Sequence, residues 1–408
     1  MISPMPAPAS PRRASPPVAL QCPNCQDAPM REFHQVPRIA VHSCILVNDR
    51  DAARDFPAAP LALGLCPRCG FIANTQYDAS HRNYNQSYEE TQGFSPRFNE
   101  FQQRLVRMLI DRYGVRGKNV LEIGCGKGEF LAQLCIEGDN RGIGIDPGCV
   151  KERLSPEAAR RMTVINDYYG PEHADLPADV ICCRHTLEHI PQTRRFLESI
   201  RRAIGDRHDT LVFFEVPDTL RILEDLAFWD VYYEHCSYFT CGSLARLFRS
   251  TGFEIESLDL DFDGQYIMLL ARPAPQPTRG RLAVEDDLAR TATAAEAFAA
   301  NADGAIKAWR QRITTVAAQG RRCVLWGSGS KAVAFLAALD LGGQVQRVVD
   351  INPYRRGRYM PLTAQPIVSP EDLASCPPDY VVVMNPIYER EIREQLSAMN
   401  LAPTLWCV

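Results

Sequence analysis

Hydrophobic residues in the middle of the chain form short runs that amphipathic or polar stretches separate. The runs cover residues 120–123, 142–145, 162–165, 180–183 and 211–216. This alternation is typical of βαβ units, in which helices cover both faces of a parallel sheet. It returns near the C-terminus, with apolar runs at 323–326, 345–349 and 380–384. The pattern predicts an α/β fold with two such units, although no internal repeat of 20–50 residues relates them.

Shifts in composition divide the 408 residues into five zones, and two or three domains are expected at about 100–200 residues each. Pro, Ala and Ser crowd residues 1–20, which predicts a disordered tail. The remaining zones are a zinc-binding domain at 21–76, a central α/β domain at 77–273, a helical connector of one or two helices at 274–320 and a second, Rossmann-like α/β domain at 321–408.

Charge and hydropathy exclude several classes of protein. With 45 Lys and Arg against 49 Asp and Glu, the net charge of −4 argues against a protein that coats nucleic acid or an anionic membrane. No apolar stretch approaches the ~20 residues of a membrane-spanning helix. The 15 cysteines follow no secretory segment, so reduced thiols and a cytoplasmic location are predicted. The oligomeric state does not follow from the sequence.

Two cysteine pairs bound the first folded zone, Cys22 and Cys25 in one C-x2-C turn and Cys66 and Cys69 in another. Such turns each present two thiolates, and four thiolates complete a tetrahedral Zn²⁺ site that leaves no position for water. The pattern therefore predicts one structural zinc ion. The simpler alternative is four free or buried cysteines; Cys44, between the pairs, is a weaker competing ligand.

The strongest chemical motif lies at residues 120–131. A predicted strand carries Glu122, and Gly124, Gly126 and Gly128 then lead into a helix. Glycines at alternate positions let the backbone turn tightly and approach a ligand. The spacing is G-x-G-x-G after an acidic residue, not the G-x-G-x-x-G of dinucleotide sites. It is the spacing of class I S-adenosylmethionine-dependent methyltransferases, in which the carboxylate can meet the ribose hydroxyls.

Further polar residues follow the next predicted strands. Asp146 ends the second strand and is predicted to bind the ribose diol, Asp167 follows the third strand and is predicted to meet the adenine, and His185 follows the fourth, near the reactive methyl. Ligands bind at this carboxyl edge of such sheets. The simpler alternative is that these acids only cap loops, but a series after three successive strands favours S-adenosylmethionine.

Two histidine-containing segments are expected over the methyl donor. One runs from His185 to His189, and the other contains Tyr232, Glu234 and His235. Methyl transfer to carbon requires removal of a proton next to a carbonyl, and a histidine is a suitable base at neutral pH. Glu234 is predicted to orient His235, with Tyr232 or His189 donating to the oxyanion. The alternative is a buried polar contact at the sheet edge.

The second α/β unit carries a weaker glycine turn. Gly327, Gly329 and Lys331 follow a predicted strand and could cradle an anion at a helix N-terminus. Asn385 follows a later strand, where it could meet a ribose or a base. Alternatives are a domain used only for packing or dimerisation, or a nicotinamide site, since Asp350 lies about 20 residues beyond the turn.

Taken together, these motifs resemble the bacterial nucleotide-sugar C-methyltransferases, over nearly the whole chain after the tail. The resemblance lies in the paired cysteines, the sequence from Glu122 to Gly128, the Tyr-x-Glu-His segment and the C-terminal Rossmann-like domain. It implies S-adenosylmethionine and zinc as cofactors and a nucleotide sugar as the small-molecule substrate. The residues that it implies in catalysis are His235, Glu234, Tyr232, His189 and Tyr88, with Tyr84 as a second candidate for the tyrosine.

The resemblance further implies that the turn at 327–331 helps to hold the nucleotide diphosphate. One segment departs from the family pattern, because Asp263 to Tyr266 stand where relatives commonly show a glycine-rich segment. That departure keeps an O- or N-methyltransferase of sugars or polysaccharide precursors as an alternative. A non-catalytic nucleotide-sugar-binding protein is a second alternative, and an RNA methyltransferase is disfavoured by the charge.

Overall fold

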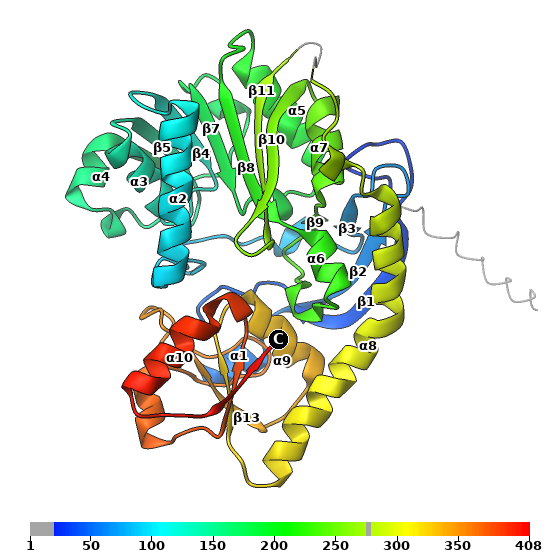
Figure 1. Cartoon of the computed structure of the whole chain (residues 1–408), viewed down its shortest axis with the longest axis vertical. Coiled ribbons are helices and arrows are strands. Elements are labelled where there is room, and N and C mark those ends of the chain that lie inside the picture. The colour runs from blue at the N-terminus through cyan, green and yellow to red at the C-terminus, as the bar shows by residue number, and fades with distance from the viewer. Residues whose placement is uncertain (1–19, 275–278) are drawn as a thin grey trace, which may run out of the picture.

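The computed structural model describes residues 20–274 and 279–408. Figure 1 shows a large sheet with its helices at the top, a second α/β unit at the bottom and a small sheet between them on one side. The predicted tail at 1–20 lies outside the described residues except for its last member. Residues 275–278 of the predicted connector also lie outside them.

The large sheet has the strand order β10-β11-β8-β7-β4-β5-β6. Its strands are β4 (Asn119–Ile123), β5 (Arg141–Ile145), β6 (Met162–Ile165), β7 (Val180–Arg184), β8 (Leu211–Pro217), β10 (Phe253–Asp261) and β11 (Tyr266–Pro273). The five predicted apolar runs are the five parallel strands β4 to β8, and the β10–β11 hairpin joins β8 antiparallel. The sheet is therefore mixed.

Helices bury both faces of this sheet, which explains why its strands are apolar throughout rather than alternating. Val120 and Phe213 lie in the core on one face, whereas the adjacent Leu121 and Phe214 lie in the core on the other. The first face packs against α2 (Pro96–Tyr113) and α3 (Glu129–Glu137), and the second against α5 (Thr193–Ile204) and α7 (Cys241–Ser250). Two short helices, α4 (Pro156–Arg161) and α6 (Thr219–Glu224), complete this unit.

The small sheet joins the N-terminal zone to the central zone. It has the order β1-β2-β3-β9, with β1 (Arg31–Ala40), β2 (Ala58–Leu65), β3 (Ile72–Asn74) and β9 (Ser237–Tyr238), and α1 (Arg50–Arg54) lies between β1 and β2 in the chain. Strand β9 pairs antiparallel with β3, with Tyr238 opposite Ile72. The segment that carries His235 is thereby fixed to the zone that carries the cysteines.

The C-terminal unit is a five-stranded parallel sheet of order β14-β13-β12-β15-β16. The strands are β12 (Cys323–Trp326), β13 (Val345–Val349), β14 (Ile367–Val368), β15 (Tyr380–Val383) and β16 (Thr404–Cys407), with helices α9 (Ser330–Leu339) and α10 (Glu389–Ala398). The three apolar runs predicted here are β12, β13 and β15. The second α/β unit thus has the strand–helix–strand order that the sequence indicates.

One long helix, α8 (Leu288–Ala318), runs along the side of the molecule from the level of the large sheet to the C-terminal unit (Figure 1). Its Phe298 lies in a core cluster with Ile39 of β1, Trp229 of the central zone and Leu325 of β12. The two α/β units are therefore packed through a shared apolar core. None of the helices in the described ranges is long and apolar enough to cross a membrane.

Candidate active site

A continuous cavity of about 520 Å³ lies between the carboxyl ends of the parallel strands of the large sheet and those of the C-terminal sheet. The ends of β4, β5, β7 and β8 line one side, the ends of β12, β13 and β15 line the other, and residues 82–94 cross between them. Apart from the cysteine pairs, all predicted site residues line this cavity except Gly128 and Glu234. The topology therefore brings most of the candidate chemistry to one place.

The glycine loop after β4 adopts backbone conformations that side chains disfavour. Gly124 and Gly126 have φ values of +71° and +53°. A Cβ on Gly124 would collide with the Thr186 hydroxyl, and one on Gly126 would lie 2.6 Å from Glu90 Oε1. Gly128, outside the cavity wall, precedes the first turn of α3. The loop thus needs glycine both for the turn and for the close approach of neighbouring groups.

Glu122 offers a free carboxylate oxygen to the cavity. The side chain is 2% exposed, and its Oε2 has no hydrogen-bond partner. Burial raises the pKa of Glu122 to about 8, although the Arg184 guanidinium opposes that shift. A buried acceptor without a donor is costly, and the ribose diol of S-adenosylmethionine supplies donors of the kind that would satisfy it.

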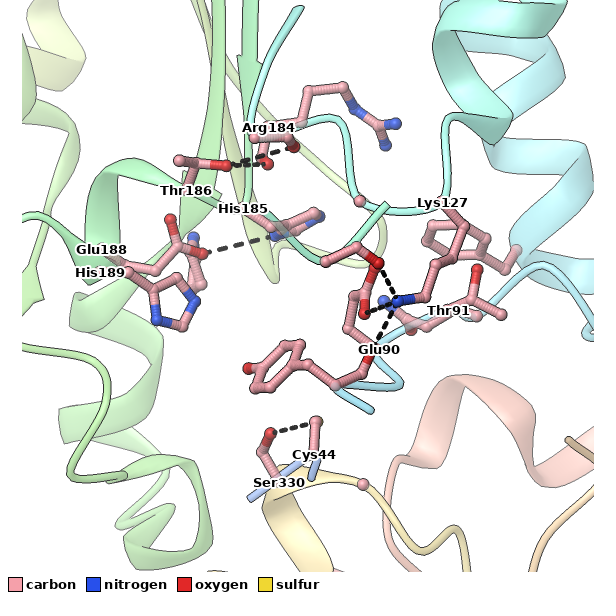
Figure 2. Close-up of a pocket in the computed structure, with 18 of the residues that line it drawn as sticks. Cys44, Glu90, Thr91, Lys127, Arg184, His185, Thr186, Glu188, His189 and Ser330 are labelled. Carbon is pink, nitrogen blue, oxygen red and sulfur yellow. Dashed lines mark hydrogen bonds and ion pairs between the residues drawn. The ribbon is translucent and has the colours of Figure 1, made fainter. Parts of the chain in front are cut away.

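Lys127 lines the cavity and connects the glycine loop to neighbouring segments. Its ammonium donates to the carbonyls of Tyr88 at 2.6 Å and Gly148 at 2.7 Å, and lies 3.6 Å from Glu90 (Figure 2). Burial raises the pKa of Glu90 to about 7, although Lys127 opposes the shift. Lys127 therefore ties the crossing segment 82–94 to the glycine loop.

The two predicted acids that follow β5 and β6 occupy different environments. Asp146 accepts backbone hydrogen bonds from Gly126 at 3.0 Å and Gly148 at 2.6 Å, so it closes the glycine loop. Asp167 is exposed and accepts from the Tyr168 amide at 2.7 Å. The guanidinium of Arg82 lies 4.3 Å from the centroid of the Tyr168 ring at this rim of the cavity.

His185 is held between two carboxylates. Its backbone has a φ of +47°, its Nε2 lies 2.7 Å from Glu215 and its Nδ1 lies 3.7 Å from Glu188. Burial alone would lower the pKa of His185, but Glu215 and Glu188 raise it to about 9. His185 is consequently an imidazolium at neutral pH, a cation on the cavity wall.

His235 has the opposite character. Its ring lies 4.6 Å from the Tyr232 ring and 4.8 Å from the His189 ring, centroid to centroid. Burial, reinforced by His189, lowers the pKa of His235 to about 4. His235 is therefore neutral at pH 7, with a lone pair available on the cavity wall.

Glu234 has other partners than the predicted one. Its carboxylate accepts from the Tyr88 hydroxyl at 2.9 Å and the Ser43 amide at 3.1 Å, and lies 3.2 Å from His42 Nδ1. The prediction that Glu234 orients His235 is corrected accordingly, because both of its oxygens are used on the far side. Glu234 holds Tyr88 in place.

The two candidate tyrosines of the crossing segment both line the cavity. Tyr88 donates to Glu234, whereas the Tyr84 hydroxyl lies 2.7 Å from His189 Nδ1. The same nitrogen lies 3.1 Å from the backbone carbonyl of Glu234, which can only accept. We therefore assign a hydrogen to His189 Nδ1, which leaves the Tyr84 hydroxyl hydrogen free to point into the cavity.

Tyr232 and Lys331 both bind Asp230, which the sequence did not single out. The Asp230 carboxylate accepts hydrogen bonds from the Tyr232 hydroxyl at 2.5 Å, from the Lys331 ammonium at 2.5 Å and from the Arg221 guanidinium at 2.8 Å. Tyr232 is thus committed as a donor, and the Lys331 ammonium is paired rather than free for a phosphate. This cluster links the central zone to the C-terminal glycine turn.

The C-terminal turn and Asn385 complete the far wall of the cavity. Gly327 has a φ of +102°, and a Cβ on Gly329 would meet open space. Asn385 exchanges two hydrogen bonds of 3.0 Å with the side chain of Gln265, so its amide is already paired across the two units. The turn is therefore open to a ligand, while Asn385 serves as a bridge.

The four predicted metal ligands lie together outside the cavity. Cys22 Sγ lies 3.7 Å from Cys69 Sγ, Cys25 Sγ lies 3.6 Å from Cys66 Sγ, and all four sulfurs lie within 4.8 Å of one another. Sulfurs at about 2.3 Å from one tetrahedral Zn²⁺ would be about 3.8 Å apart. Cys44 lies elsewhere, 3.4 Å from the Ser330 hydroxyl.

Several functional candidates escaped the sequence reasoning. Asp230, Glu90 and Glu188 all line the cavity, and none follows from spacing alone. Glu188 had the best signal, because it stands between His185 and His189 in one short segment. Its carboxylate faces both histidine-containing segments, which are distant in the chain.

Comparisons with known proteins indicate a methyltransferase. A methyltransferase domain family matches residues 98–258, and a C-methyltransferase C-terminal domain family matches residues 276–407. The C-methyltransferase NovU of Streptomyces niveus is 28% identical over 363 residues, which cover 85% of each chain. A ubiquinone biosynthesis O-methyltransferase of Erwinia tasmaniensis is 33% identical over 97 residues, covering 22% of this chain and 40% of the relative.

Among solved structures, the riboflavin-derivative dimethyltransferase RosA of Streptomyces davawensis aligns with a TM-score of 0.35 and 20% identity, covering 43% of this chain and 56% of that chain. The two matched domain families together span most of the chain, and the similarity to NovU also extends over most of it. The chain is an S-adenosylmethionine-dependent methyltransferase.

Proposed function

We propose that the protein methylates a carbon atom next to the carbonyl of a nucleotide-linked keto-sugar. The observation that carries this proposal is His235, a neutral histidine that lines a cavity shared by the cofactor loop and the C-terminal turn. The similarity of the chain to the C-methyltransferase NovU favours carbon as the acceptor atom. The nucleotide sugar is the substrate class implied by the resemblance of the sequence to the nucleotide-sugar C-methyltransferases.

The residues around the glycine loop fit S-adenosylmethionine. Glu122 would accept from the ribose hydroxyls, Asp167 and Tyr168 lie where the adenine would rest, and Gly124 and Gly126 leave space for the amino-acid end. When bound, this cofactor supplies a methyl group on a positively charged sulfur. Glu90, whose Oε2 has no hydrogen-bond partner, adds an acceptor for the ammonium of the amino-acid end.

In the proposed reaction His235 takes the proton from the carbon beside the carbonyl. Because the imidazole is uncharged at pH 7, its lone pair is available without prior loss of a proton. The electrons left on carbon spread onto the carbonyl oxygen, and Tyr84 donates its hydroxyl hydrogen to that oxygen. The electron pair on this carbon would then form the bond to the methyl group, while the sulfur–methyl bond of the cofactor breaks and leaves its electron pair on sulfur.

The acceptor would lie across the cavity with its nucleotide toward the C-terminal unit. The helix α9 begins at Ser330 directly after Gly329, and its first backbone amides have no partner within the helix. Such a helix start favours an anion such as a diphosphate. Because Lys331 is paired with Asp230, the proposed diphosphate contacts come from backbone amides, with Arg355 of the cavity wall as the further cation.

The cysteine cluster is proposed to hold one structural zinc ion. Four sulfurs at tetrahedral spacing leave no open position for water, which favours a structural role of the metal ion over a catalytic one. The cluster packs against the same core face as Phe71 and Phe239. Purified protein should contain about one zinc per chain, and a preparation that folds fully without metal would contradict this proposal.

The catalytic proposal is tested by proton exchange in deuterated water with a panel of nucleotide-linked keto-sugars. Wild-type protein should exchange the proton next to the carbonyl of one of them and then methylate that carbon. His235→Ala should lower turnover about 10²–10⁴-fold while leaving the affinity for S-adenosylmethionine unchanged. Tyr84→Phe should have a smaller effect, because it removes only one donor to the oxyanion.

His208→Ala is the matched control, because His208 is exposed and lies outside the cavity wall. It should behave like wild type. A methyl group found on oxygen, by NMR of the product, would contradict the carbon assignment and leave the enzyme as an O-methyltransferase. Full proton exchange in His235→Ala would show that another group is the base.

A further inference from the structure

We propose that Glu188 is the positioning carboxylate of His235, which fixes the ring and stabilises its protonated form. This inference rests on the proposed function, in which His235 is the base. Glu188 lies in the 3₁₀ turn Leu187–His189 that follows β7, and 2% of the residue is exposed. The sequence neighbour of His235, Glu234, is not available for this role.

The geometry favours Glu188 over every other described carboxylate near the ring. One carboxylate oxygen of Glu188, one ring nitrogen of His189 and one ring nitrogen of His235 all lie within 4.8 Å of one another. The Oε2 atom of Glu188 is buried and has no hydrogen-bond partner. An unsatisfied carboxylate oxygen in a dry site is costly, and a ring nitrogen of His235 lies within 4.8 Å of this carboxylate.

Other charged groups face His235, but their oxygens are occupied. The groups that face it are Glu188, His189, Glu234 and Asp230, together with the rings of Tyr232 and Tyr238. Glu234 accepts from Tyr88 and from Ser43, and Asp230 accepts from Tyr232, Lys331 and Arg221. Among these described carboxylates, Glu188 has the free oxygen.

Glu188 is the end of a row of alternating charges. Arg184 pairs with Glu215 at 2.8 Å, Glu215 with His185 at 2.7 Å, and His185 lies 3.7 Å from Glu188 Oε1 (Figure 2 shows the last contact). Burial would raise the pKa of Glu188, but His185 and the other histidines lower it overall. Glu188 is therefore ionised, with Oε1 near His185 and Oε2 without a hydrogen-bond partner.

This arrangement solves a difficulty in the use of His235 as a base. Burial and His189 hold the pKa of His235 near 4, which disfavours the protonated ring that proton abstraction must create. An ionised carboxylate stabilises that ring through charge, most strongly when a bound acceptor excludes water. A carboxylate on one nitrogen also selects the tautomer whose lone pair faces the acceptor.

The test uses zinc-loaded, full-length protein with ¹⁵N- and ¹³C-labelled histidine and needs no acceptor. NMR of the ring atoms reports the tautomer and pKa of His235, whose signals are assigned as those lost in His235→Asn. Wild type should show one dominant tautomer. Glu188→Gln should lower the pKa of His235 by about 1 pH unit or more, since an opposite charge at 4–6 Å shifts a pKa by that amount. It should also change the tautomer ratio.

Glu188→Asp should restore much of the wild-type behaviour, because it keeps the charge. Glu198→Gln, on an exposed part of α5, should change neither quantity. An unchanged tautomer ratio and pKa in folded Glu188→Gln would overturn the proposal. If that variant fails to fold, a mixture of His235 tautomers in the wild type would overturn it.

A second metal equivalent in wild type that Glu188→Gln loses would also overturn the proposal, because Glu188, His189 and His235 would then be metal ligands. The two proposals fail separately. A product methylated on oxygen, or proton exchange that persists in His235→Ala, contradicts the proposed function. The NMR titration still decides whether Glu188 positions His235, because it measures the pair without any reaction.

Discussion

The glycine turns of the two α/β units are closed by the same hydrogen bonds. After β4, the Gly124 amide donates to the carbonyl of Ile145 and the Gly126 amide to Asp146. After β12, the Gly327 amide donates to the carbonyl of Val349, and the Ser328 amide donates to the Asp350 carboxylate at 2.8 Å. In each unit the carboxylate that ends the second strand fastens the turn that follows the first.

The side chains around the two turns differ. Glu122 stands two residues before Gly124 with a free oxygen, whereas Leu325 stands two residues before Gly327. Asp350 also accepts from the Ser328 hydroxyl at 2.5 Å and the Asn352 amide at 2.8 Å. The backbone arrangement is therefore shared, and the two turns differ in the polar groups that they leave unpaired.

The largest expected difference between the turns comes from glycine replacement. Gly126→Val places a side chain against Glu90 at a left-handed φ, which costs about 1–3 kcal/mol. The affinity for S-adenosylmethionine should fall up to about 100-fold, measured by calorimetry. Gly329→Ala, where the added Cβ meets open space, should bind this cofactor like wild type. Equal losses in both variants would refute the assignment of the cofactor to the first turn.

A matched pair of aspartate variants sharpens the comparison. Asp146→Ala should weaken S-adenosylmethionine binding about tenfold, which is about 1.4 kcal/mol, because the glycine loop loses its fastening. Asp350→Ala should leave that affinity unchanged and lower the free energy of unfolding by about 1–3 kcal/mol, since the buried Ser328 amide loses its acceptor. Calorimetry and urea denaturation of both variants measure these effects; the reverse pattern would exchange the roles of the turns.

The smallest effect concerns the pH dependence of Glu122. Its pKa is about 8 in the folded protein, whereas the ordinary pKa of an exposed glutamate carboxyl is 4.5. The stabilisation from its bound proton is complete below pH 4.5 and is lost as the pH rises toward 8. Without added cofactor, wild type should lose about 1 kcal/mol more stability from about pH 5 to about pH 6 than Glu122→Gln. If the stability of wild type and of Glu122→Gln changed equally between the two pH values, the unpaired state of this carboxylate would be contradicted.

Features that depend on residues close together in the chain, such as strands and tight turns, could be predicted from the sequence. The apolar runs at 120–123 and 323–326 became β4 and β12, since a strand buried on both faces must be apolar throughout. The glycine spacing predicted the tight turn after β4, because φ values such as +71° at Gly124 disfavour other residues. The two C-x2-C turns identified the sulfur cluster, because each turn holds two of its members.

Side-chain pairing across the fold could not be predicted in the same way. Glu234 and His235 are adjacent in sequence, but Glu234 pairs with His42, 192 positions earlier. Likewise, the free hydroxyl hydrogen belongs to Tyr84 and not to Tyr88, because only the folded chain brings His189 and Glu234 to these tyrosines. Periodicity fixes which face a residue occupies but not which partner it meets there.

The pairing of β9 with β3 has a consequence for how the chain unfolds. Two residues after His235, the backbone at Ser237 enters the small sheet beside Ala73, which follows the cysteine Cys69 closely. Loss of the N-terminal sheet would leave β9 without its strand partner and release the segment that carries His235. The N-terminal and central zones therefore belong to one cooperative unit, and a truncation at the compositional boundary near residue 76 cuts through the sheet that supports the active site.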